Sequence, residues 1–141
     1  MKYSKLMKER IRRAQVLFTE LGYEITETEN YEDSFTGIIE NLSGFQTVFF
    51  IDKDSKFLEL AFTFTFSHTL NSFLTARLDE IMKICYEYGC YMNFHTDEED
   101  ISFSVFSKIY YMGLNYYSLK ETLKDFTSCI ESLTEAVELH K

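Results

Sequence analysis

Proline and tryptophan are absent from this 141-residue sequence, which also contains only five glycines and three cysteines. Without proline, no proline-rich linker divides the chain, so we expect a single domain over residues 1–141. The cysteines, Cys85, Cys90 and Cys129, are odd in number and lack paired spacing, which indicates a reducing compartment rather than a disulfide framework. No segment approaches the roughly 20 apolar residues of a membrane span, and no apolar run follows the charged N-terminus. We therefore expect a cytoplasmic protein with no signal peptide and no membrane partner.

Basic residues are also scarce, because 14 Lys and Arg stand against 23 Asp and Glu, giving a formal net charge of −9. Binding to a phosphate backbone needs clustered Lys and Arg, so we expect no nucleic-acid partner. Hydrophobic residues make up 45% of the chain and aromatic residues 17%, which excludes a disordered protein. The composition therefore predicts a folded acidic domain.

The most regular pattern in the sequence is the alternation in residues 57–66. Leucine or phenylalanine occupies every second position there: Leu58, Leu60, Phe62, Phe64 and Phe66. A period of two is typical of a β-strand with one buried face. The other positions carry a thinner set that includes Phe57, Glu59 and two threonines. We interpret this stretch as a central strand whose leucine and phenylalanine row faces the core.

Hydrophobic periodicity and turn residues predict seven further elements. They are a helix at 2–21, strands at 35–42 and 45–51, a helix at 71–88, strands at 91–96 and 101–110, and a helix from Ser118 to the C-terminus. The acidic segment 23–33 stays unassigned, although Tyr23 and Ile25 could begin a short edge strand. Short turns between strands indicate antiparallel neighbours. The predicted fold is α+β, with a five-stranded antiparallel sheet, the order α-β-β-β-α-β-β-α, and helices packed on the sheet.

The start of the last helix has a specific signature. Ser118-Leu119-Lys120-Glu121 matches a capping box, in which the serine and the glutamate each bond the other's end of the backbone. We therefore expect the helix to begin at Ser118.

Candidate chemical sites are few, and none matches a known requirement in full. Cys85, Cys90 and His95 are each separated by four residues, whereas structural zinc needs four ligands and closer cysteine pairs. Ser67 and His68 are adjacent in a strand and point to opposite faces, so they cannot form a catalytic pair directly. The sequence contains no G-x-S-x-G, no phosphate-binding glycine loop and no H-E-x-x-H motif. We predict no catalytic residues, no metal and no cofactor, and hence no enzyme.

Apolar residues exceed what one covered sheet face would use. In the strand at 45–51, both alternating sets of side chains are apolar. Either the pair Phe49 and Ile51 or the pair Val48 and Phe50 therefore lies on the second face of the sheet. A large exposed apolar patch on a soluble protein usually marks an interface. We predict a partner-binding or self-association face, with helices covering both faces as the alternative. The candidate residues are Phe49, Ile51, Phe57, Phe106 and Tyr110.

The order of the predicted elements resembles the type III secretion chaperone-like fold, which includes the secretion chaperones and the YbjN-like proteins. The likeness covers nearly the whole chain, from Lys2 to His140. It rests on three strands that precede the helix Leu74–Tyr88, namely Phe35–Leu42, Phe45–Ile51 and Phe57–Phe66, and on the strand Ile101–Tyr110 that precedes the helix Leu119–Val137. It implies no catalytic residues and no cofactor. The chaperones act as homodimers that hold an unfolded segment of a client protein, and the YbjN-like branch is implicated in regulation.

Our first hypothesis is therefore a non-enzymatic protein-binding module of the secretion-chaperone or YbjN-like kind, dimeric through the surplus apolar face. Its partner would be a protein or an unfolded client segment. A second hypothesis is a small acidic immunity or antitoxin-type inhibitor, whose net charge of −9 would complement a basic toxin. An enzyme that uses surface carboxylates is a third.

Overall fold

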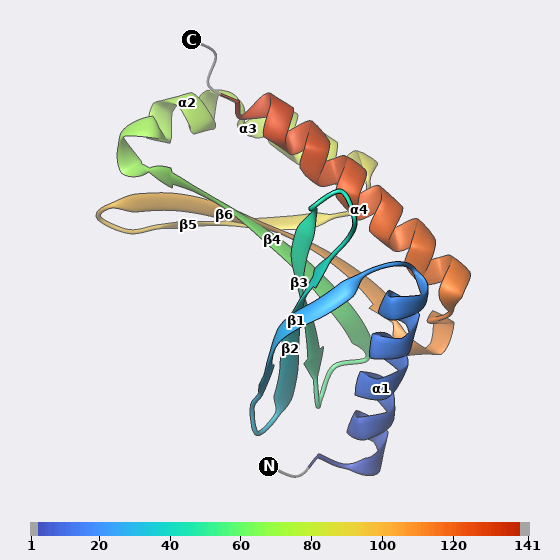
Figure 1. Ribbon diagram of the computed structural model, residues 1–141. Coiled ribbons are helices and arrows are strands. Elements are labelled where there is room, and N and C mark those ends of the chain that lie inside the picture. The colour runs from blue at the N-terminus through green and yellow to red at the C-terminus, as the bar shows by residue number, and fades with distance from the viewer. Residues whose placement is uncertain (1–2, 139–141) are drawn as a thin grey trace. The chain divides into compact units, whose positions relative to one another are not determined.

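The computed structural model describes residues 3–138, and within them the chain forms six β-strands, four α-helices and two short 3-10 helices (Figure 1). The strands are β1 (Glu24–Asn30), β2 (Ser34–Glu40), β3 (Gln46–Asp52), β4 (Phe57–Ser67), β5 (Tyr91–Thr96) and β6 (Asp100–Tyr110). The helices are α1 (Lys5–Glu20), η1 (His68–Leu70), α2 (Asn71–Ala76), α3 (Leu78–Glu87), η2 (Tyr111–Gly113) and α4 (Tyr116–Ala136). The strands form a sheet in the order β1-β2-β3-β4-β6-β5. The predicted α+β class is confirmed.

The chain divides into two compact units. The first contains the described residues up to Leu60 together with Lys108–Leu123, and the second contains Ala61–Ser107 with the described residues from Lys124 onward. Strands β4 and β6 and helix α4 run through both units. A single domain over the whole chain stays a prediction.

The prediction of five strands was wrong, because the acidic segment forms a sixth strand, β1. It pairs antiparallel with β2, with Ile25 opposite Ile39. Every residue of β1 is exposed or half-buried. An edge strand that buries so few side chains shows almost no alternation of apolar and polar residues in its sequence, because only Ile25 needs to face the core. Tyr23 and Ile25 were the correct signal.

The first unit has its core between α1 and the buried face of β2, β3 and the start of β4. Helix α1 begins after Ser4, whose Oγ accepts a hydrogen bond from the Met7 N–H, and ends before Gly22 at φ +90°. The Phe18 ring lies 5.1 Å from the Phe49 ring on β3. Phe49 is paired with Gly37 on β2, where the missing side chain leaves room for the ring.

The second unit contains a break where one helix was predicted. The helix expected at 71–88 is interrupted at Arg77, which ends α2 and precedes α3. The Arg77 guanidinium stacks over the Phe73 ring, 3.7 Å from its centroid, and donates to the Phe73 carbonyl at 3.3 Å. Neither Asn71 nor Ser72 caps a helix start, since the 3-10 helix η1 precedes α2. The strand predicted at 91–96 is confirmed as β5.

Helix α4 begins one turn earlier than its predicted capping box. Asn115 accepts a hydrogen bond from the Ser118 N–H at 3.0 Å, and the Ser118 Oγ accepts one from the Asn115 N–H at 2.9 Å. Ser118 therefore occupies the position that glutamate usually has in a capping box, and Asn115 is the cap.

We expect Asn115→Ala to lower the free energy of unfolding by about 1 kcal/mol, because the Ser118 N–H loses its acceptor. Asn115→Asp keeps that acceptor and is expected to leave stability nearly unchanged. Urea denaturation of both variants measures the difference, and equal losses would contradict the assigned cap.

No helix within residues 3–138 is both long enough and apolar enough to cross a membrane.

Candidate protein-binding surfaces

The predicted binding residues of β3 lie in the core. The side chains of Phe49 and Ile51 are fully buried at 0% exposure, and the Phe49 ring also contacts Phe35 at 6.0 Å. Placing these two residues on a partner surface was therefore wrong. The other pair considered, Val48 and Phe50, is half-buried on the opposite face of the strand. The physical reason is that α1 packs against one face of β3. The side chains on that face become core, and those on the other face do not.

Two other predicted residues, Phe57 and Tyr110, come together in the first unit. Their ring centroids are 5.8 Å apart and the rings meet edge to face. Phe57 is half-buried, while Tyr110 is 53% exposed. The Lys108 ammonium lies 4.9 Å from the Phe57 centroid and 5.5 Å from the Tyr110 centroid. We call Val48, Phe50, Phe57 and Tyr110 the Phe57 face.

A carboxylate lies beside the Phe57 face. Burial, then the nearby Asp52 carboxylate, raises the pKa of Glu59, while the Lys108 ammonium opposes that shift. The Lys108 ammonium makes cation–π interactions with both aromatic rings. Charged groups thus accompany the apolar side chains here, which lowers the gain from covering this face with an apolar partner.

A second aromatic surface lies in the second unit, and three of its rings, on β4, occupy positions where the sequence predicted core. We call it the Phe103 cluster, and it consists of Phe62, Phe64, Phe66, Phe94 and Phe103. Its central ring, Phe103, stacks on Phe64 at 4.7 Å and contacts Phe94 at 5.4 Å. Phe103 is fully buried, whereas Phe94 is 38% exposed. The cluster is therefore an aromatic surface with a buried centre.

The buried row predicted along β4 is only partly correct. Leu58 and Leu60 are fully buried, but Phe62, Phe64 and Phe66 are half-buried. The alternation is intact along the strand, but the amount of cover differs between its two ends.

Phe106, the remaining predicted residue, lies on the other face of β6 from Phe103. It is half-buried and opposite Tyr91 in the β5–β6 ladder. Its face in the second unit is polar, with a hydrogen bond of 2.8 Å between the Thr63 and Ser104 hydroxyls. Phe106 is therefore not part of the Phe103 cluster.

The three cysteines are buried, and at least two are in mutual contact. The Cys129 thiol, then burial, raises the pKa of Cys85. For Cys129, the hydrogen bond with Cys85 lowers the pKa, but contact with Cys90 and burial raise it to about 12. Thiols with raised pKa values are protonated and poor nucleophiles at neutral pH. Among the described residues, no three His, Cys, Asp or Glu side chains are arranged to hold a metal ion.

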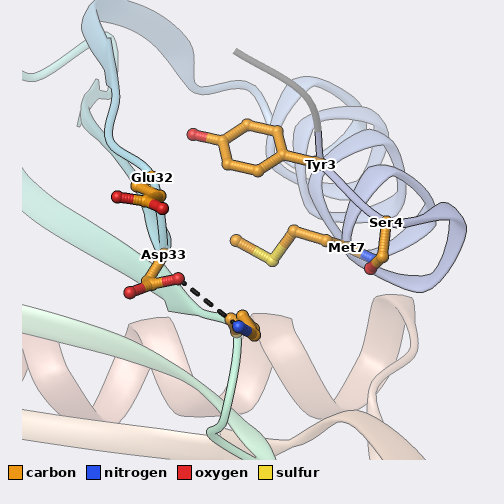
Figure 2. Close-up of a pocket in the computed structure, with 6 residues that line it drawn as sticks. Tyr3, Ser4, Met7, Glu32 and Asp33 are labelled. Atoms are coloured by element: carbon orange, nitrogen blue, oxygen red, sulfur yellow. Dashed lines mark hydrogen bonds and ion pairs between the residues drawn. The ribbon is translucent and has the colours of Figure 1, made fainter.

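A small pocket of about 280 Å³ lies in the first unit between the start of α1 and the β1–β2 turn (Figure 2). Tyr3 and Met7 point toward Glu32 and Asp33, and the Tyr3 hydroxyl donates to the Ser34 carbonyl at 2.7 Å. Asp33 forms an ion pair of 3.5 Å with Lys53, and both side chains are mostly exposed.

Solved structures of the same fold exist. An uncharacterized protein from Methanothermobacter thermautotrophicus superposes with a TM-score of 0.63 at 13% identity, over 94% of this chain and 99% of that one. YbjN from E. coli, described as a candidate transcription regulator, superposes with a TM-score of 0.54 at 12% identity, over 90% and 87%. The chain has a YbjN-like fold. No family model and no curated protein matches the sequence.

The YbjN-like fold confirms the resemblance drawn from the order of elements. At this level of identity it establishes the architecture and leaves the function to be argued from the surfaces. Sequence reasoning missed the Phe103 cluster because alternation shows which side chains share a face, not how fully that face is covered. The one available signal was Phe94, an aromatic residue in a short strand next to an acidic turn.

Proposed function

We propose that this YbjN-like protein is a non-enzymatic protein-binding module that receives an apolar segment of a partner on the Phe103 cluster. The observation that carries the proposal is the cluster itself, in which the central ring is buried and the four surrounding rings are incompletely covered. Phenylalanine rings that stay partly exposed together are typical anchors of protein interfaces.

The charge near the cluster indicates which partner it suits. The hairpin of β5 and β6 ends in the acidic turn Asp97-Glu98-Glu99-Asp100. The Asp100 and Glu99 N–H groups, which bond the Asp97 carboxylate, lower the pKa of Asp97, so this carboxylate stays ionised. A segment with apolar anchors and basic flanks would complement this arrangement. The net charge of −9 supports a regulator that acts on proteins rather than one that binds DNA directly.

The Phe57 face is the second candidate surface. Two of its rings, Phe57 and Tyr110, already have a charged partner in Lys108. We therefore assign the partner segment to the Phe103 cluster.

The test uses a synthetic extended peptide with alternating Leu and Phe and lysines at both ends, and the same peptide with glutamates at the ends. We expect the lysine peptide to bind in fluorescence anisotropy and the glutamate peptide to bind at least tenfold more weakly. Phe66→Ser is expected to weaken binding of the lysine peptide at least tenfold. Thr65→Ser, on the adjacent exposed position, is the matched control and is expected to change nothing.

Circular dichroism checks that both variants remain folded. Equal affinity of Phe66→Ser and wild type would contradict the assignment to the Phe103 cluster. An acidic inhibitor of a basic toxin would behave differently, because its binding would fall steeply with salt and would not respond to Phe66→Ser.

A further inference from the structure

The sheet has two edge strands, β1 and β5, since these stand at the ends of the strand order. An edge strand presents backbone N–H and C=O groups to which another strand can pair. Soluble proteins usually guard such an edge with charged side chains, proline or a β-bulge. The two edges of this protein differ in that respect.

The β1 edge is guarded in two ways. It carries three carboxylates in seven residues, on Glu24, Glu27 and Glu29. Its register with β2 also shifts between Thr26 and Glu29, and Glu27 there adopts a positive φ of 46°. Both features oppose the approach of another strand.

The β5 edge has none of these guards. Its sequence, Tyr-Met-Asn-Phe-His-Thr, contains no Asp, Glu, Lys, Arg or proline. All six residues pair with β6 in an uninterrupted register. Five of the six are exposed, including Tyr91 at 54% and Phe94 at 38%. A regular, exposed and uncharged edge is a template for pairing.

The β5–β6 turn determines which backbone groups face outward. The Asp97 N–H donates to the Asp100 carbonyl at 3.0 Å, so this pair is a hydrogen-bonded one. Hydrogen-bonded and non-hydrogen-bonded pairs alternate along an antiparallel ladder. The backbone groups of Met92, Phe94 and Thr96 therefore point away from β6.

We propose that β5 pairs antiparallel with β5 of a second copy of this chain, across a two-fold axis near Asn93 and Phe94. Most surfaces of an acidic chain repel a second copy, because each carries a net charge of −9. The β5 strand brings no Asp, Glu, Lys or Arg side chain to this interface. Antiparallel pairing also places the acidic turns, Asp97–Asp100, at opposite ends of the join. A second copy can therefore approach the β5 edge with less electrostatic repulsion than it meets elsewhere on the surface.

The same pairing brings Phe94 of both copies near the axis and joins the two Phe103 clusters into one surface. The pairing itself does not depend on the proposed peptide binding, because it rests on the edge of β5. A join of six residues buries less than a standard interface, so we expect a dimer that dissociates at micromolar concentrations.

Sedimentation velocity over a range of micromolar concentrations tests the proposal. Wild type is expected to approach twice the monomer mass of 16.7 kDa. Asn93→Lys places two like charges at the axis and is expected to weaken the dimer at least tenfold, whereas Asn93→Gln is expected to leave it intact. Asn93 lies on the opposite face of β5 from Phe94, so Asn93→Lys should still bind the lysine peptide.

Amide hydrogen exchange identifies the edge directly. The Met92, Phe94 and Thr96 amides are expected to gain protection as the protein concentration rises. A wild type that stays monomeric with these three amides exchanging fast would overturn the proposal. So would a dimer that Phe57→Lys dissociates and Asn93→Lys does not, because the Phe57 face would then be the interface.

Discussion

Phe49→Ala is expected to lower the free energy of unfolding by about 3–5 kcal/mol, the range for removing a fully buried phenylalanine side chain. The Phe49 ring has 0% exposure and lies between Phe18 of α1 and Phe35 of β2. Removing it leaves a cavity under α1 that the neighbouring rings cannot fill without moving the helix. Guanidinium denaturation of wild type and variant measures the loss.

Phe50→Ala is the matched control, because it removes the same ring one residue along the strand. Phe50 is half-buried on the other face of β3, so we expect less than half the loss of Phe49→Ala. Equal losses would show that both faces of β3 are covered to the same extent. In that case Phe50 could not belong to an open face.

Gly37→Ala is expected to destabilise the protein by about 1–3 kcal/mol through overpacking. A Cβ atom at Gly37 would lie 2.8 Å from Phe49 Cε1 and 2.9 Å from Phe49 Cζ. Both distances are shorter than van der Waals contact, and the Phe49 ring has little room to move because Phe18 and Phe35 contact it. The same denaturation experiment applies.

Gly113→Ala is the control for Gly37→Ala, since nothing lies within 4 Å of a Cβ placed there. We expect it to change stability by less than the Gly37 variant. The double variant Gly37→Ala/Phe49→Ala gives a second check, because the methyl group would then enter the space of the missing ring. Its loss should be smaller than the sum of the two single losses, and additivity would contradict the contact.

The local patterns of the sequence were reliable guides to the elements. Alternation over 57–66 corresponds to β4, and the helix predicted at 2–21 corresponds to α1, which ends shortly before Gly22. These features can be read locally because the periods of two and 3.6 are properties of the backbone itself. The order of the elements also predicted the type III secretion chaperone-like fold, and a solved structure of its YbjN-like branch matches the chain.

The candidate site depended on information that the sequence does not contain. Phe49 and Phe50 have the same chemistry and adjacent positions, yet one is fully buried and the other is half-buried. Along β4, Leu60 and Phe64 lie on the same side of the strand, but only Leu60 is fully buried. The sequence could assign neither difference, because each is set by elements distant in the chain.

Alternation and amphipathic spacing thus determine that this chain folds as an acidic α+β protein with more apolar surface than one sheet face needs. Tertiary contacts decide which part of that surface becomes core and which part stays incompletely covered. They also decide that β1 is a guarded edge and that β5 is not. The physical reason is that the spacing of apolar residues along the sequence specifies which side chains share a face. How deeply those side chains are buried depends on what packs against that face.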